Sequence, residues 1–332
     1  MAERETSSGR DRVCYYIQTH TRPAQVLRLV QRIKAASPRS VVLIHHDASG
    51  PALDVPKLES MEGVYVIVGP GGYGNYTHLD RYFAAVDWLE AHNVKFDWLQ
   101  NMTGQDYPIQ PIAATHRFLA ESDADGYLEY MPVFWDRTPR DADWGVGPPG
   151  AHFLSKFDTS LRFNYRHRWI GHPTRTKQRY LRPLMAANLV QPWFRISLSY
   201  STVAARRHYT IFNDGDFICY AGSFFCTLSA PCVYYARDFS RDHPDIVAFF
   251  RGMPAPNEVF LQTVLVNSGK FRIVPDSKRY IDWSGTRNNH PKTLGVADIP
   301  AIVSSDAHWA RKFDAVADAE VLDVIDRHIG LA

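Results

Sequence analysis

The sequence is poor in cysteine, in net charge and in long apolar runs. Its 332 residues include four Cys, and 37 Lys or Arg nearly balance 35 Asp or Glu, for a formal net charge of +2. No apolar run approaches the roughly 18 residues that a membrane-spanning helix needs. The charged opening MAERETSSGRDR lacks the apolar core of a signal peptide. We therefore expect no transmembrane segment and a cytoplasmic location.

The cysteines fit neither a disulfide framework nor a zinc site. None of Cys14, Cys219, Cys226 and Cys232 has CxxC spacing, and all four have apolar neighbours. Such thiols are typical of buried structural cysteines in a reducing compartment. The remaining composition, 45% apolar and 22% charged, is that of an ordinary globular protein. At about 150 residues per domain, the length suggests two domains.

Apolar runs alternate with helical stripes in the first third of the chain. This alternation predicts an α/β fold with a Rossmann-like, mainly parallel central sheet flanked by helices, and a ligand crevice at the carboxyl ends of the strands. Strands are expected at 13–19, 41–46, 63–68 and 96–102, and helices at 23–36 and 77–92, the second capped by Thr77.

The middle of the chain is less regular than its two ends. Residues 1–12 are expected to be a flexible N-terminus, 13–134 and 217–330 two halves of one domain, and 135–216 an irregular insertion with one or two helices. Later strands are predicted at 222–229 and 278–283, and later helices at 256–267 and 318–328.

Positive charge is concentrated in this middle part. Residues 159–213 contain ten Lys or Arg and no Asp or Glu, interleaved with aromatic residues. Such a stretch fits an anionic acceptor, peripheral contact with a membrane surface, or nucleic acid, and equally a solvated face balanced by acids elsewhere. No nucleic-acid-binding motif accompanies the stretch, so we expect no nucleic-acid partner.

Two short motifs point to functions that their contexts do not support. The glycines in 69–74 match GxGxxG, the signature of an NAD-dependent oxidoreductase, but they follow the third strand, and no acid stands near the end of the next strand. The polar run His45-His46-Asp47 could suggest a metal cluster, but adjacent strand residues point to opposite faces. A glycine-rich bend and a hydrogen-bonded polar pair are the favoured interpretations.

Three DxD strings could each hold a divalent cation on a nucleotide diphosphate through hard oxygen ligands. Three occurrences in one chain show how little the pattern means alone. None follows the fourth strand, where Gln105-Asp106 offers one carboxylate. The strings are Asp123/Asp125, Asp141/Asp143 and Asp214/Asp216.

Two further segments carry charges that are open to two interpretations. Glu258 stands in the first turn of a predicted helix, where the helix dipole favours a carboxylate, so it is either a stabilising terminal residue or a functional acid. Arg311 and Lys312 lie beside aromatic residues and form either a surface pair or a clamp for a diphosphate.

Several segments taken in order resemble glycosyltransferase family 14, which includes the core-2/I-branching N-acetylglucosaminyltransferases and the protein xylosyltransferases. The resemblance runs from about residue 13 to 328 and is weak across 135–215. It rests on YYIQTHTRP, HHDAS, NYTHLDRYFAAVDWL, FDWLQNMTGQDYPIQP, GYLEYMP, AGSFFCTLS, PAPNEVFLQTVLVNS, YIDWSG and HPKTLGVADIPAIVSSDAHWARKFD.

The resemblance implies a GT-A type glycosyltransferase fold and inverting transfer of a sugar from a UDP-sugar to an acceptor hydroxyl, without a metal or other cofactor. The implied base is Glu258, within a motif whose usual Asp is here Asn257. GlcNAc and xylose are the expected donor sugars, and glucuronic acid stays open. The acceptor would be a carbohydrate or a glycosylated small molecule. A non-catalytic sugar- or nucleotide-binding protein is the alternative.

The same resemblance assigns further site residues. Lys312 would hold the diphosphate, with either Lys292 or Arg311 as the second cation. The half 13–134 would bind the nucleotide-sugar, the insertion would face the acceptor, and 217–330 would carry the catalytic and diphosphate residues. Asp47 and Ser223 are assigned to the donor, and Glu129, Asp106 and Trp283 to the acceptor or the transferred sugar.

Overall fold

The computed structural model describes residues 10–72, 74–133, 162–170, 175–198, 201–208, 210–212, 216–284 and 291–331. The pair Asp141/Asp143, Asp214 and the first nine residues of the chain lie outside the described residues.

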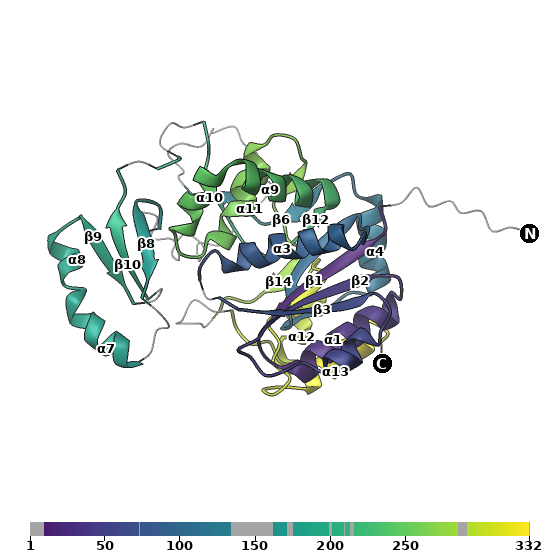
Figure 1. Ribbon diagram of the computed structural model, residues 1–332. Helices are drawn as coiled ribbons and strands as arrows, with labels where there is room; N and C mark the ends of the chain where they lie inside the picture. The colour runs from purple at the N-terminus through teal and green to yellow at the C-terminus, as the bar shows by residue number, and fades with distance from the viewer. Residues whose placement is uncertain are drawn as a thin grey trace, which may run out of the picture.

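A seven-stranded sheet forms the centre of the molecule (Figure 1). Neighbouring strands are parallel except where β12 pairs with β4 and β6. The mainly parallel sheet and its first four strands are therefore confirmed. In spatial order the strands are β13 (Ile273–Val274), β6 (Gly126–Leu128), β12 (Cys226–Ser229), β4 (Trp98–Thr103), β1 (Val13–Thr19), β2 (Val41–Asp47) and β3 (Val64–Gly69).

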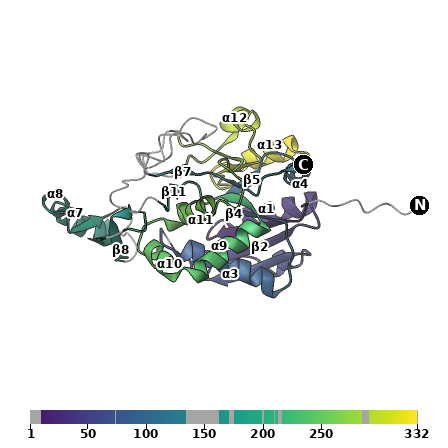
Figure 2. The ribbon, with the colours of Figure 1, turned by 90° about the horizontal axis from the view of Figure 1, so that it is seen from above.

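Helices cover both faces of this sheet, because its central strands are apolar on both sides. Along β1, Cys14 and Tyr16 join one core, and Tyr15 and Ile17 join the other. Figure 2 shows the sheet between these two layers. The first layer contains α3 (Thr77–Ala91), α9 (Ala230–Asp242), α10 (Pro244–Arg251) and α11 (Phe260–Asn267); the second contains α1 (Pro23–Ala36), α2 (Val55–Glu59), α4 (Ile112–Glu121), α12 (Ile299–Val303) and α13 (Glu320–His328).

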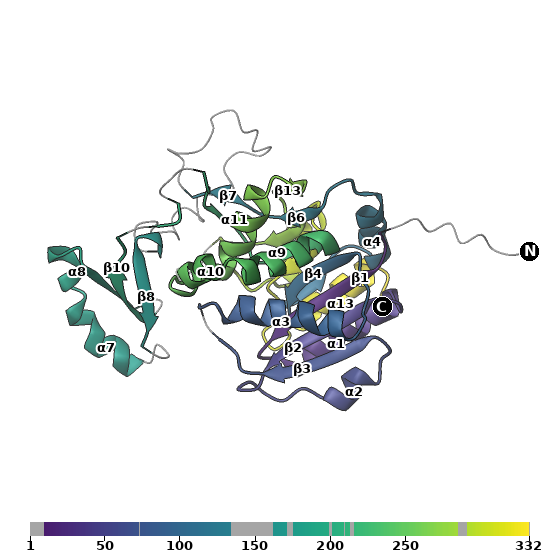
Figure 3. The same cartoon turned by 45° about the horizontal axis from the view of Figure 1, so that its top comes forward.

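The described residues between 162 and 212 form a unit beside this body, which we call the basic subdomain (Figures 1 and 3). It combines a three-stranded antiparallel sheet with two helices. The two helices agree with the sequence prediction, but the sheet was not predicted, because its short strands carry arginines in place of an apolar run. The elements are β8 (Tyr165–Trp169), α7 (Arg175–Leu184), α8 (Ala187–Val190), β9 (Phe194–Ser197) and β10 (Thr202–Arg206).

Two small sheets connect the C-terminal part to the body. One joins β14 (Arg279–Ile281), β15 (Trp309–Arg311) and β5 (Asp106–Pro108), and the other joins β7 (Met131–Pro132) and β11 (Tyr220–Ala221). The first of these sheets pairs Arg311 of β15 with Asp106 of β5, the strand that follows β4.

Three local predictions require correction. The helix expected at 256–267 is divided into the 3-10 turn η2 (Pro256–Glu258) and α11, and the Glu258 carbonyl accepts a hydrogen bond from the Gly222 amide outside the helix. The strand expected at 222–229 begins only at Cys226. Thr77 does not cap α3; instead the Asn75 carboxamide accepts a hydrogen bond from the Thr77 amide.

The four cysteines are buried and unpaired, as predicted. Burial raises the pKa of both Cys226 and Cys232 to about 12, so these thiols are inert packing groups. Among the described helices, none has the length and apolar character needed to cross a bilayer.

Candidate active site

A pocket of about 1350 Å³ opens at the carboxyl ends of β1, β2, β3 and β4. Residues that directly end or follow these strands form one wall of the pocket, as expected for an open, mainly parallel sheet. They are Gln18 and Thr19 at the end of β1 and His20 after it, Asp47 at the end of β2 and Ala48 and Ser49 after it, Pro70, Gly71 and Gly72 after β3, and Asn101, Met102 and Thr103 in β4.

Asp47 is fixed at the end of β2 by the turn that follows. Its carboxylate accepts hydrogen bonds from the amide and the hydroxyl of Ser49, at 2.9 and 2.8 Å. Burial would raise the pKa of Asp47, but these hydrogen bonds and the charge of Arg81 outweigh burial and lower it. A Cβ atom on Gly71 would lie 1.6 Å from an Asp47 carboxylate oxygen, so a larger residue there would displace this carboxylate. Asp47 is therefore an ionised, oriented acceptor in the pocket wall.

Arg81 of α3 is a buried cation that reaches the same wall. Arg81 is 6% exposed, and one of its Nη atoms donates a hydrogen bond to the His45 carbonyl at 2.5 Å. The Nε atom of Arg81 has no hydrogen-bond partner in the described residues. Burial lowers its pKa, with smaller opposing effects from Tyr16 and Asp47. Sequence reasoning missed Arg81; the available signal was a basic residue among the buried positions of an amphipathic helix.

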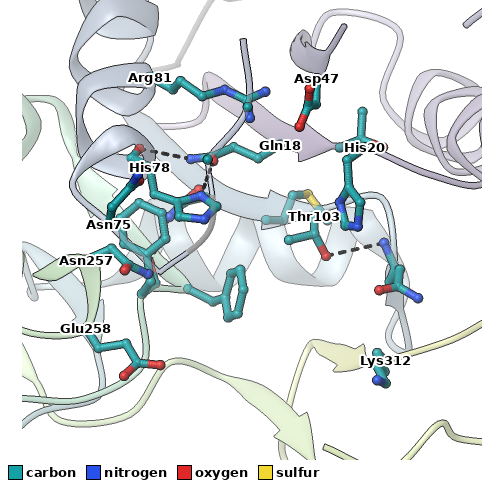
Figure 4. Close-up of a pocket in the computed structure, with 18 of the residues that line it drawn as sticks. Gln18, His20, Asp47, Asn75, His78, Arg81, Thr103, Asn257, Glu258 and Lys312 are labelled. Atoms are coloured by element: carbon teal, nitrogen blue, oxygen red, sulfur yellow. Dashed lines mark hydrogen bonds between the residues drawn. The ribbon is translucent and has the colours of Figure 1, made fainter. Parts of the chain in front are cut away.

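Histidine and glutamine side chains complete this side of the pocket. His78 contacts the Gln18 carboxamide oxygen through Nδ1 at 3.1 Å (Figure 4). Burial lowers the pKa of His78 to about 4, so the ring is neutral near pH 7 and donates to that oxygen. Neither residue was predicted from the sequence.

Glu258 lies on the opposite side of the pocket, in η2. Two backbone hydrogen bonds hold this turn, from the Ala255 amide to the Gly74 carbonyl at 2.8 Å and from the Gly222 amide to the Glu258 carbonyl at 2.9 Å. The Glu258 carboxylate accepts a hydrogen bond from Arg162 of the basic subdomain at 3.3 Å. Three segments that are distant in sequence therefore orient one carboxylate.

Arg311 and Lys312 bring positive charge to a third side of the pocket. The Arg311 guanidinium lies 3.8 Å from the Phe225 ring centroid, and its Nε lies 3.7 Å from the buried Asp106 carboxylate. Burial lowers the pKa of Arg311 to about 10, which leaves it charged near pH 7. Lys312 has no ion-pair partner within the described part of the chain.

The other predicted site residues lie at different depths. Ser223 and Trp283 line the pocket. Glu129 does not line it; its backbone carbonyl packs against Gly222, the residue before Ser223.

Asp106 and Lys292 do not line the pocket. Asp106 is 0% exposed, accepts two hydrogen bonds of 2.6 Å from Thr103, and pairs with Arg279 at 3.1 Å and with Arg311 at 3.7 Å. Lys292 forms ion pairs with Asp298 at 2.5 Å and with Asp282 at 3.7 Å. Of the two candidates for a second pocket cation, Arg311 is the one that the fold brings to the cavity.

The pocket therefore has a carboxylate and a cation at each of two ends. Figure 4 shows Asp47 and Arg81 at one end, and Glu258 and Lys312 at the other, with His78 and Gln18 between them. Aromatic side chains of Trp169, Phe225 and Trp283 also line the cavity. Such a pocket suits an elongated ligand with hydrogen-bonding, anionic and apolar parts.

The described residues contain no group of three or more His, Cys, Asp or Glu side chains arranged as metal ligands. Of the DxD pairs, Asp123 and Asp125 lie away from the pocket, where Asp123 pairs with Arg272 and Asp125 with Arg10. The glycine-rich bend follows β3, and the turn after β1, where a dinucleotide-binding loop would stand, has no glycine in Thr19–Arg22.

Comparison with known proteins gives one informative similarity. No family model matches the chain. Over 110 residues the chain is 31% identical to the beta-glucuronosyltransferase GlcAT14A of Arabidopsis thaliana. That protein is a glycosyltransferase. The similar region covers 32% of this chain and 24% of the plant protein, so the match spans about a quarter of that relative's length. The chain is distantly similar to a glycosyltransferase, and its mixed α/β fold with a mostly parallel sheet is compatible with one.

Proposed function

We propose that the protein is an inverting, metal-independent glycosyltransferase of the GT-A type that transfers a sugar from a UDP-sugar to an acceptor hydroxyl. The observation that carries this proposal is the convergence of Asp47, Glu258 and the pair Arg311–Lys312 on one pocket from three distant parts of the chain. These residues supply the three functions that the reaction needs: a hydrogen-bond acceptor for a nucleoside, a base, and cations for a leaving diphosphate.

In the proposed reaction, the acceptor oxygen attacks the anomeric carbon as Glu258 takes the hydroxyl proton. The bond between the anomeric carbon and the UDP oxygen breaks, and UDP leaves with the electron pair. A positioned base contributes roughly 10²–10⁴ in rate. Attack from the face opposite the diphosphate inverts the anomeric configuration.

Arg311 and Lys312 would neutralise the charge that develops on the departing diphosphate. Fixed cations aimed at such charge act without reorganisation, and removing one such donor typically costs about 10²–10³ in rate. Arg311 is preorganised by Asp106 and Phe225, whereas Lys312 has no ion-pair partner among the described residues. This arrangement favours side chains in place of a metal at the diphosphate.

At the nucleoside end, Asp47 and Arg81 are a complementary acceptor and donor. A pyrimidine edge presents an N–H flanked by carbonyl oxygens, which a carboxylate and a guanidinium can bind together. The unpartnered Nε of Arg81 supports this assignment. Trp169, Phe225 and Trp283 give apolar surfaces for the sugar ring.

A panel of UDP-sugars tests the proposal. Thermal unfolding is measured with UDP-GlcNAc, UDP-xylose and UDP-glucuronic acid, and UDP release is measured in the same samples. A ligand at 100 times its dissociation constant adds about 2.7 kcal/mol to the free energy of unfolding. Stabilisation with UDP release supports a transferase, stabilisation without release indicates a non-catalytic binding protein, and no stabilisation by any UDP-sugar contradicts the proposal.

A further inference from the structure

The outer surface of the basic subdomain is unusually apolar. The described chain exposes eleven large apolar side chains, and eight of these lie within residues 170–203. Leu189 is 89% exposed, Val190 84%, Tyr180 74% and Trp193 70%. These residues belong to α7, α8 and the segment before β9, which lie farthest from the α/β body in Figures 1 and 3. A cluster of exposed apolar side chains on one part of a protein marks an interaction surface.

The same surface is cationic and lacks internal compensation. Arg179 and Arg182 are exposed on α7. Neither forms an ion pair in the described part of the chain, and the same holds for the exposed Arg166, Arg168 and Arg206. No Asp or Glu occurs in residues 159–213. The surface therefore attracts an anionic partner and has no acidic side chain of its own sequence to neutralise it.

We propose that this surface, defined by Arg179, Tyr180, Arg182, Leu189, Val190 and Trp193, binds the interface of an anionic lipid bilayer. Apolar side chains such as Leu189 and Val190 gain free energy by entering the acyl boundary, and Trp and Tyr prefer the headgroup level. Arginines on the same helices can bind lipid phosphates while their stems stay apolar. Nucleic acid could bind the arginines through its phosphates, but it has no apolar interior in which the exposed Leu189 and Val190 of α8 could be buried.

The opposite end of the subdomain reaches the pocket. Trp169 at the end of β8 and Ser201 before β10 line the cavity, so the same small sheet connects the proposed bilayer surface with the candidate active site. If the proposed function holds, this geometry favours an acceptor that is itself held in the bilayer. Lipid binding does not depend on that activity and is measured separately.

Vesicle flotation of the full chain tests the proposal without any sugar donor. The protein is mixed with vesicles of phosphatidylcholine alone or with a third of phosphatidylglycerol, at 0.05 and 0.5 M salt. We expect flotation with the anionic vesicles at low salt, little with the neutral vesicles, and loss at high salt. A protein that stays in the dense fraction with anionic vesicles at low salt would overturn the proposal.

Two double variants separate the contributions. Arg179→Glu with Arg182→Glu should weaken partitioning by more than about 30-fold, since each lost cation near the surface is worth roughly a factor of five and each added carboxylate is repelled. Leu189→Asp with Trp193→Ala should abolish flotation, because it removes two of the inserted apolar side chains. The matched control is Val316→Asp with Arg39→Glu, two exposed positions on the α/β body; it should float like the wild type.

The apolar variant decides between a bilayer and another anion. If Leu189→Asp with Trp193→Ala floats as well as the wild type, binding is purely electrostatic and the proposal fails. The proposal also fails if a DNA duplex displaces the protein from vesicles and the two double variants lose affinity for that DNA to the same extent. It fails as well if the control variant loses as much vesicle binding as the double variants do.

Discussion

The Glu258 carboxylate lies 3.3 Å from the Nη2 atom of Arg162, although the two residues are 96 positions apart. The Arg162 side chain is 4% exposed and the Glu258 side chain 29%. A buried guanidinium from the basic subdomain therefore holds a carboxylate that faces the pocket. This contact couples the subdomain directly to the residue proposed as the base.

Arg162→Met should reduce turnover about 10- to 100-fold and leave UDP affinity unchanged. The substitution removes a hydrogen bond to a charged group, a contact worth roughly 1.5–3 kcal/mol, and frees the carboxylate to leave its reactive position. Steady-state kinetics and UDP titration provide the two readouts.

Arg207→Met is the matched control for Arg162→Met. Arg207 is a partly buried arginine of the same subdomain whose hydrogen bonds to described residues all go to backbone carbonyls, those of Tyr165, Phe249 and Gly252. The Arg207→Met variant should be less stable than the wild type, but its folded fraction should turn over at the wild-type rate. Equal kinetic defects in both variants would show that Arg162 acts through the fold alone.

Lys312→Ala should weaken UDP binding far more than uridine binding. Its proposed partner is the diphosphate, which uridine lacks, and loss of a charge-assisted contact costs about 1.5–3 kcal/mol. Isothermal titration with both ligands measures the difference. Lys292→Ala, whose side chain is paired outside the pocket, should bind both ligands like the wild type. Equal losses for UDP and uridine in Lys312→Ala would remove Lys312 from the phosphates.

The free energy of unfolding should fall as the pH falls from 6.5 towards 4. Burial, aided by the charge of Arg81, lowers the pKa of His45 to about 4, whereas an unfolded histidine has a pKa near 6.5. The unfolded chain therefore takes up a proton in this range that the folded chain excludes, which costs up to about 1.4 kcal/mol per pH unit for each such histidine.

His45→Gln should reduce the pH dependence of the free energy of unfolding by the contribution of one buried histidine. The measurement is urea unfolding at pH 6.5, 5.5 and 4.5. The exposed His92 provides the control substitution, His92→Gln. An unchanged slope in His45→Gln would contradict the assignment of a buried, neutral His45.

Activity should persist in excess EDTA, with at most mild stimulation by magnesium or manganese. In the proposed reaction Arg311 and Lys312 neutralise the diphosphate charge, and a lone carboxylate binds a divalent ion weakly. The measurement is UDP release with and without chelator. Activity that disappears with EDTA and returns with manganese would contradict this prediction and would make Asp214 and Asp216 the first residues to substitute.

The sequence predicted β1 to β4 of the central sheet because these strands contain buried apolar runs, but it missed β6 and β13, which are only three and two residues long. The segments 13–19 and 42–46 are buried on both faces of the sheet. Their continuous apolar pattern therefore identifies them as strands and also places them in the interior of the sheet. The small sheet of the basic subdomain was missed because strands such as YRHRW place arginines on one face and give no apolar run.

The site was predicted only where its residues stand in recognisable motifs. Asp47, Glu258 and Lys312 belong to such motifs and line the pocket. Arg162 has no local signal, because its contact with Glu258 arises from the tertiary fold. The choice between Lys292 and Arg311 likewise depends on which side chain the fold brings to the pocket, and that information is absent from the sequence.

Glu258→Gln tests the central claim most directly. The substitution keeps the shape and the hydrogen bond from Arg162 but removes the proton acceptor, so UDP release from the donor that the wild type uses should fall by roughly 10²–10⁴, with UDP affinity nearly unchanged. Retention of more than about a tenth of wild-type turnover would show that Glu258 is not the base of the reaction.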